Sequence, residues 1–199
     1  ERRADVPNLI AEMAAKGRAA GAPMLSHDDT RAETLAYFRG LGAGVAEFPM
    51  LIEAAQAARD NGVMIIFGSP NAARSGSYIG SLSAGDMVEA GLCVVLASDY
   101  FYPAMLAAVA RLDAEKRADR STLWQLVSSG PAKAMNLSDR GDIALGKRAD
   151  LVLVDWPDGQ TPAILGTWIA GRCAYLTHPA AATAGTVAKA KAEPVLCDH

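Results

Sequence analysis

Three groups of polar side chains have the residue types and spacing to do chemistry. The first is centred on His27, which is followed directly by Asp28 and Asp29. A neutral imidazole can hold zinc, iron or manganese, or act as a general base. The two aspartates could orient that imidazole, or they could stabilise the N-terminus of a following helix. A hydrogen-bonded histidine at a strand end is the structural alternative.

Asp99 and Glu47 form the second group, because each follows a short apolar run. A carboxylate at the position of Asp99 could bind a metal ion and accept a proton from metal-bound water. An N-cap for the next helix is its structural alternative. Glu47 would need a partner if it is buried, because an isolated buried charge is costly.

The third group is the segment 68–81, which is rich in Gly, Ser and Asn and contains one guanidinium, that of Arg74. Backbone amides, hydroxyls and arginine are groups that bind phosphate. The segment lacks the Gly-Lys-Ser/Thr ending of a P-loop, so it is not a Walker A motif. Tyr100, Phe101 and Tyr102, which follow Asp99, could line a pocket or simply pack against a helix.

The hydropathy pattern predicts the framework that must position these groups. Apolar runs typical of buried parallel strands occur at 23–26, 44–48, 63–67 and 92–97. Helical periodicity predicts helices at 1–21, 31–40, 50–61, 84–90, 103–118 and 121–129, with Thr30 and Glu33 forming a capping box. Each polar group comes directly after a predicted strand. Ligands of α/β sheets and barrels bind beyond the carboxyl ends of the strands, so we expect all three groups on one face.

The pattern changes at about residue 140. Short β segments follow at 143–145, 149–155, 164–169 and 172–176, with Gly and Pro turns and no helices between them. We therefore expect a first domain at 1–138 and a small β module at 139–178. The remaining residues, 179–199, form an Ala- and Lys-rich tail that is expected to be mobile.

The composition excludes several classes of protein. The chain has 199 residues, 51% of them hydrophobic, and a formal net charge of −3, which is unlike a disordered chain. Acidic residues outnumber basic ones, which argues against nucleic-acid binding, and no run is apolar enough for a membrane span. Three scattered cysteines, Cys93, Cys173 and Cys197, predict reduced thiols in a cytoplasmic protein.

Several motifs resemble a known family. Residues 141–155, Gly-Asp-Ile-Ala-Leu-Gly-Lys-Arg-Ala-Asp-Leu-Val-Leu-Val-Asp, are similar to the closing signature of the amidohydrolase superfamily, and 131–137 resembles the helix that precedes it. Four motifs then narrow the resemblance: Ser-His-Asp-Asp-Thr at 26–30, Ala-Glu-Phe-Pro at 46–49, Gly-Ser-Pro-Asn with Arg-Ser-Gly-Ser at 68–77, and Ala-Ser-Asp-Tyr at 97–100. In this order they resemble the PhnM-type amidohydrolases of phosphonate metabolism.

The resemblance implies a fold and an activity. The fold would be the second half of a (β/α)8 TIM-like barrel plus a small C-terminal β module. The activity would be that of a metal-dependent hydrolase that releases pyrophosphate from α-D-ribose 1-methylphosphonate 5-triphosphate. On this resemblance His27 and Asp99 hold a divalent metal, zinc in the first place with iron or manganese as alternatives, and Asp99 also accepts a proton. The residues implied in substrate binding are Asn71, Arg74, Ser77, Glu47 and Tyr78.

The partners implied are a phosphorylated small molecule, further copies of the chain in a homo-oligomer, and other proteins of phosphonate catabolism. Two departures from the family pattern stand out. Tyr78 and Ser81 replace the usual histidine and asparagine of the phosphate loop, which predicts altered or reduced activity. The first-strand His-x-His pair has no counterpart, so we expect the C-terminal half of a longer protein, with open strand edges and an exposed apolar face.

Two other functions remain open from the sequence. One is an amidohydrolase that opens a cyclic amide or deaminates a base, which a pocket without anion-binding groups would favour. The other is a fragment or homologue without catalytic activity, which would hold no metal.

Overall fold

The computed structural model describes residues 5–74 and 82–177. The chain divides between Leu137 and Ser138 into two compact units, and each is described by itself.

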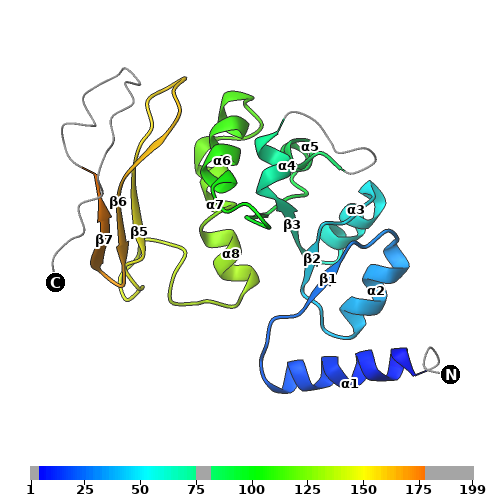
Figure 1. The fold of residues 1–199 in the computed structure, drawn as a ribbon. Coiled ribbons are helices and arrows are strands. Elements are labelled where there is room, and N and C mark those ends of the chain that lie inside the picture. The colour runs from blue at the N-terminus through cyan, green and yellow to red at the C-terminus, as the bar shows by residue number, and fades with distance from the viewer. Residues whose placement is uncertain (1–4, 75–81, 178–199) are drawn as a thin grey trace. The chain divides into compact units, whose positions relative to one another are not determined.

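The first unit is built around a four-stranded parallel sheet (Figure 1). Its strands are β1 (Leu25–His27), β2 (Val45–Glu47), β3 (Met64–Gly68) and β4 (Val95–Ala97), and they lie in the order β1-β2-β3-β4. The register places His27 opposite Glu47, and Glu47 opposite Ile66. Because neighbouring strands are in sequence order, every connection is a strand–helix–strand crossover, as the alternating pattern predicts.

One helix precedes these strands, and the others connect or follow them. They are α1 (Val6–Ala19), α2 (Ala32–Gly40), α3 (Ile52–Asp60), α4 (Ser69–Ala73), α5 (Ala84–Glu89), α6 (Ala104–Ala114), α7 (Arg120–Gln125) and α8 (Ser129–Ala134). In α3 the buried residues are Ala54, Ala55 and Ala58, a spacing that places them on one face of the helix. Their small side chains allow α3 to lie close to the sheet.

The core joins the sheet to α8. Val45, Ile66 and Val95, from three neighbouring strands, pack with Ala134 of α8. At the start of α8, a Cβ on Gly130 would lie 2.3 Å from the carbonyl oxygen of Val94. Glycine is therefore needed for this close approach of α8 to β4.

Some predicted boundaries in the first unit are wrong. The segment 68–81 is not wholly a loop, because its beginning forms α4. The predicted helix at 121–129 ends too late, because α7 ends at Gln125 and Ser129 already begins α8. The capping box is absent: α2 starts one residue later than predicted, Arg31 is its N-cap, and no side chain caps it. Helical periodicity reports which residues share a face, and it fixes helix ends poorly.

The second unit contains a three-stranded antiparallel sheet of β5 (Leu151–Asp155), β6 (Ala163–Ile169) and β7 (Arg172–Leu176). A turn joins β6 and β7, one residue earlier than the Gly171–Arg172 turn that the sequence predicts: Ala170 and Gly171 are both at positive φ, at 51° and 79°, and Arg172 begins β7. A two-residue turn of this kind matches the twist of a hairpin. The predicted strand at 143–145 is wrong, because Ile143 and Leu145 are exposed and lie in no strand. A segment without a neighbouring strand has no backbone partner for a sheet, even when its side chains are apolar.

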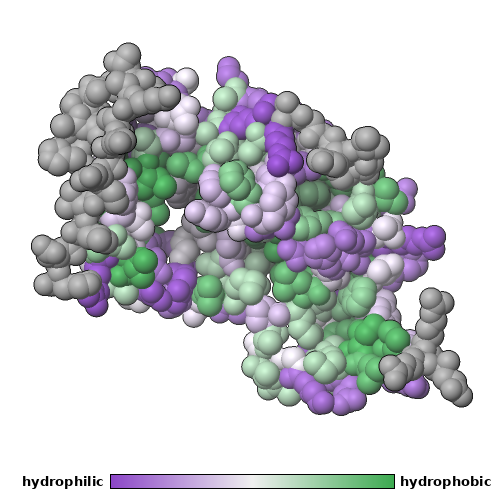
Figure 2. Space-filling model, viewed as in Figure 1, coloured by the Kyte–Doolittle hydropathy of each residue, from purple (hydrophilic) through white to green (hydrophobic). Residues whose placement is uncertain are grey.

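The first unit exposes apolar side chains on α1, where Val6, Leu9 and Met13 form one stripe and no residue is buried (Figure 2). β1 and β4 are the outer strands of the sheet. The edge of β4 is partly covered, because the Leu96 N–H donates to the Leu126 carbonyl at 2.8 Å. Among the described residues, no helix is long and apolar enough to cross a membrane.

The expectation that all three thiols are reduced is wrong for Cys173, which is disulfide-bonded. Cys93 is a free thiol, buried at the start of the segment that leads into β4. Spacing along the chain does not determine which cysteines the fold brings together, so this outcome could not be predicted from the sequence.

Candidate active site

Three strand ends share an unusual backbone conformation. Asp28 follows β1, Phe48 follows β2 and Asp99 follows β4, and their φ angles are 57°, 52° and 48°. Non-glycine residues rarely adopt the left-handed region, and a bulky residue such as Phe does so least readily. Such strain is concentrated at functional sites, where the surrounding structure holds it in place. The carboxyl edge of the sheet is therefore the first place to look for a site.

A cavity of about 440 Å³ lies at this edge. Its apolar lining comes from Phe48, Pro49, Met50, Phe67, Pro70, Leu82 and Tyr100, and its polar lining from Asn71, Arg74 and Asp99. Three residues predicted from the sequence are thus brought together, although they come from α4, the residue after it and the end of β4. Mostly apolar walls with a few polar groups are typical of small-molecule sites.

Arg74 is the cation of this cavity. It lies directly after α4 and its side chain is exposed. Arg111 and Arg117, which share a second cavity with it, are neutralised by ion pairs to Glu115, Asp86 and Glu89 at 2.6 to 2.8 Å. In the described part of the chain no carboxylate pairs with Arg74, so its guanidinium remains available to an anionic ligand.

The Asn71 side chain, predicted as a phosphate contact, has partners within the chain. Its side-chain oxygen accepts the Ala84 N–H at 2.9 Å, and its Nδ2 donates to the Leu82 carbonyl at 3.4 Å. Both ends of the amide are therefore used within the chain, where they join α4 to the start of α5. Asn71 lines the cavity while also holding one of its walls.

Asp99 is exposed and lies in the turn that follows β4. That turn is closed by the Phe101 N–H, which donates to the Ser98 carbonyl at 3.0 Å. Tyr100 lines the cavity, whereas Phe101 and Tyr102 are exposed and are not part of its lining. Of the three aromatic residues suggested as a pocket wall, only Tyr100 is one.

His27 and its neighbours lie at the end of β1. The His27 Nδ1 is 3.0 Å from the Asp28 carboxylate, which places Asp28 in contact with the imidazole. Asp29 is 1% exposed and accepts a hydrogen bond from Ser26, and its other carboxylate oxygen has no partner within the described residues. Glu47 is half-buried on the neighbouring strand, directly opposite His27.

The described residues do not complete a metal centre. His27 and Asp99 are of the right chemical types, since imidazole and carboxylate suit zinc, iron and manganese. His27 ends one outer strand and Asp99 follows the other, however, and β2 and β3 lie between them. Within residues 5–74 and 82–177, no three His, Cys, Asp or Glu side chains are grouped as ligands.

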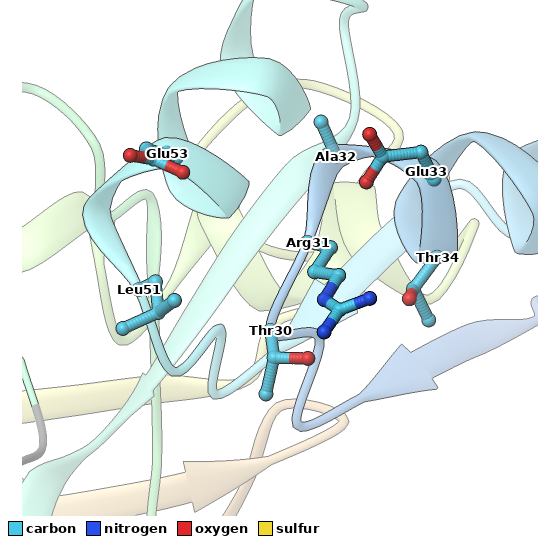
Figure 3. A pocket seen from close by; sticks show the side chains of 7 residues that line it. All are labelled: Thr30, Arg31, Ala32, Glu33, Thr34, Leu51 and Glu53. Carbon is cyan, nitrogen blue, oxygen red and sulfur yellow. The ribbon is translucent and has the colours of Figure 1, made fainter.

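A third hollow lies at the start of α2 and α3 (Figure 3). It is lined by Thr30, Arg31, Ala32, Glu33, Thr34, Leu51 and Glu53. Two carboxylates and one guanidinium line it, so a phosphorylated ligand would meet net negative charge. This hollow is therefore a poorer candidate for phosphate than the cavity that contains Arg74.

Phe48 was not predicted as a site residue, although it directly follows the strand-end acid Glu47 in sequence, and that position could have indicated it. The predicted residues Ser77 and Tyr78 lie outside the described residues.

Comparison with known proteins identifies the family. The sequence profile of the amidohydrolase family matches residues 2–175. The chain belongs to the amidohydrolase family. A member from Escherichia coli strain K12, alpha-D-ribose 1-methylphosphonate 5-triphosphate diphosphatase, is 44% identical over 149 residues. These residues make up 73% of this chain and 39% of the E. coli protein, so the chain spans well under half the length of this amidohydrolase.

Solved amidohydrolase structures show the same fold. Enamidase gives a TM-score of 0.65 at 16% identity, over 84% of this chain and 51% of the enamidase chain. An amidohydrolase from Thermotoga maritima MSB8 gives 0.62 at 19% identity, over 77% of this chain and 43% of the other. The predicted fold class is confirmed: the parallel strand–helix units are part of a TIM-like barrel, and a small β-sheet module follows them.

Proposed function

We propose that this chain forms the C-terminal part of a metal-dependent hydrolase that releases pyrophosphate from α-D-ribose 1-methylphosphonate 5-triphosphate. The observation that carries the proposal is the 44% identity to the E. coli diphosphatase over 149 residues. The cavity supports it independently, because the Arg74 guanidinium, which no carboxylate of the described residues neutralises, shares it with the carboxylate of Asp99. A pocket without anion-binding groups would have favoured the alternative, which is opening a cyclic amide or deaminating a base, and Arg74 is an anion-binding group in this cavity.

In this proposal Arg74 and Asp99 act at different points of the reaction. The Arg74 guanidinium binds phosphate oxygens and offsets the negative charge that develops as the anhydride bond breaks. Asp99 accepts a proton from the attacking water. The water oxygen bonds to phosphorus, the α–β anhydride bond breaks, and pyrophosphate leaves. Glu47, Ser77 and Tyr78 are further proposed substrate contacts.

His27 and Asp99 are the proposed ligands of a divalent metal, with zinc in the first place and iron or manganese as alternatives. When bound, the metal would polarise a phosphoryl oxygen or lower the pKa of a bound water. The remaining ligands of this metal would come from outside the described residues. None of the hydrolysis steps given above therefore depends on the metal. A homo-oligomer, other proteins of phosphonate catabolism as partners, and a cytoplasmic location also remain proposals.

The test is pyrophosphate release by the full-length protein. Replacing Arg74 by Met removes a charge-assisted contact of about 1.5–3 kcal/mol, so KM for the ribosyl triphosphate should rise about 10- to 100-fold. Replacing Asp99 by Asn should lower kcat by about 100-fold or more. Arg59→Met is the matched control, because Arg59 is exposed on α3 beside Asp60 and does not line the cavity.

Ammonia release without pyrophosphate release would show that the second enzymatic function is the correct one. Absence of both products, together with absence of bound metal by mass spectrometry, would show a protein without catalytic activity. Unchanged kinetics in Arg74→Met would show that Arg74 does not contact the substrate.

A further inference from the structure

Phe48 has the least expected backbone of the carboxyl edge. It directly follows Glu47 at the end of β2, and its φ of 52° is one that a bulky side chain rarely adopts. The Phe48 N–H nevertheless donates to the Ile66 carbonyl at 3.0 Å, so the hydrogen-bond ladder to β3 continues through the strained residue. A strained residue persists only where its contacts hold it there.

The contacts of the Phe48 ring extend in three directions. Its centroid lies 5.4 Å from that of His27, with the two rings at 85°, which is an edge-to-face arrangement. Phe48 also packs against the core cluster that contains Ile66 and Val95. It then forms part of the cavity wall together with Arg74 and Asp99. One side chain from the end of β2 therefore connects the histidine at the end of β1 with the cavity near β3 and β4.

His27 depends on such support because it is otherwise open to solvent. Its side chain is 54% exposed, and the Asp28 carboxylate holds only the Nδ1 side of the ring. A single 3.0 Å contact with a carboxylate that is itself 57% exposed leaves the imidazole free to change rotamer. The edge-to-face contact with Phe48 fixes the second side of the ring.

We infer that Phe48 is a positioning residue that fixes the His27 imidazole at the edge of the proposed substrate cavity. The strained φ at Phe48 sets the direction in which its ring leaves the strand, and the core residues hold the ring in that direction. The expected effect of Phe48 on kcat rests on the proposed function, whereas its expected effect on the position of the His27 ring does not.

The test compares Phe48→Leu with Phe48→Tyr. Leucine has the same left-handed backbone cost and remains apolar, but it has no ring to place against His27. Tyrosine keeps the ring. The matched control is Phe38→Leu, because Phe38 is also half-buried in an edge-to-face pair, with Tyr37 at 5.2 Å and 71°, on α2 and outside the cavity lining.

Two measurements are made on the full-length protein. The first is the imidazole Cε1–Hε1 resonance of His27, assigned by its loss in His27→Gln. We expect it to move in Phe48→Leu, where the aromatic ring current is removed, and to keep its place in Phe48→Tyr and Phe38→Leu. The second is pyrophosphate release, where misplacement of a site residue should lower kcat of Phe48→Leu by about 10- to 100-fold. KM should change by less than about threefold.

An unmoved His27 resonance in Phe48→Leu would overturn the inference, and so would a shift of equal size in Phe38→Leu. A shifted resonance with unchanged kcat would limit Phe48 to a structural role and equally overturn it. If Phe48→Leu fails to fold, Phe48→Tyr decides the question, because this variant keeps the aromatic ring. A changed His27 resonance together with a lowered kcat in Phe48→Tyr would then contradict the inference. If the wild-type protein releases no pyrophosphate, the proposed function fails, and the His27 resonance still decides whether Phe48 places the ring.

Discussion

Replacing Asn71 by Ala separates the two roles that this residue could have. The sequence predicts a phosphate contact, whereas the structure places both amide atoms in bonds to Ala84 and Leu82. Ala84 is fully buried at the first position of α5, so its N–H would lose its partner without gaining water. An unsatisfied buried donor costs about 1–3 kcal/mol, so we expect a loss of about 2 kcal/mol in the free energy of unfolding.

For a chain of this length, a loss of that size lowers Tm by about 4–8 °C. Asn71→Asp should lose less, because a carboxylate oxygen can still accept the Ala84 N–H. Asn61→Ala is the matched control: the Asn61 Nδ2 donates to the Ala57 carbonyl at 2.8 Å at the exposed end of α3, and its loss should cost only about 0.5 kcal/mol. Thermal and urea unfolding, followed by circular dichroism, measure all three variants.

The reasoning would be refuted if Asn71→Ala unfolded with the same Tm as the wild type. It would also be refuted if Asn71→Asp were as unstable as Asn71→Ala, because the acceptor to Ala84 would then contribute nothing. A normal Tm combined with a raised KM in Asn71→Ala would instead support the phosphate contact that the sequence predicts.

Three further predictions concern the first unit. The Arg111 guanidinium, and to a smaller extent that of Arg117, lowers the pKa of Glu115 in the folded protein. The ionised Glu115 therefore stabilises the fold above the ordinary glutamate pKa of about 4.3, and this stabilisation is lost as the pH falls through the lower folded pKa. Glu115→Gln should flatten the acid limb of stability against pH, and an unchanged limb would contradict this. Burial raises the pKa of the Cys93 thiol to about 12, so iodoacetamide should label Cys93 only after unfolding, as read by peptide mass spectrometry. Gly130→Ala should unfold the protein or lower Tm strongly, because its Cβ would lie 2.3 Å from the Val94 carbonyl, whereas Gly40→Ala, with nothing within 4 Å, should not.

The order of strands and helices could be predicted because it depends on local pattern. Each of the four parallel strands lies within or beside a predicted apolar run, since strands buried on both faces need continuous apolar residues. The same pattern predicts that Arg74 and Asp99 lie at one edge of the sheet, because the carboxyl ends of parallel strands lie on the same side. The predicted contact between Asp28 and His27 also holds, since these residues are neighbours in sequence.

The remaining features depend on contacts between distant segments. The bond from Ala84 to Asn71 spans thirteen residues, and no spacing rule connects an asparagine in α4 with the first residue of α5. The contact between Phe48 and His27 depends on strand register, which the sequence does not specify residue by residue. Burial of Asp29 likewise requires knowledge of which side of β1 faces the helices.

Whether His27 and Asp99 can bind the same metal ion depends on the curvature of the barrel. His27 ends β1 and Asp99 follows β4, and these two strands are three steps apart in the sheet. At about 4.8 Å a step, a flat sheet would separate their backbones by about 14 Å. Two ligands of one zinc ion each lie only about 2 Å from the metal. A single ion can therefore reach both residues only if the sheet curves towards a closed barrel, where strand ends converge on one axis. The fold places both residues at the correct end of the strands, and the closure of the barrel decides whether they meet.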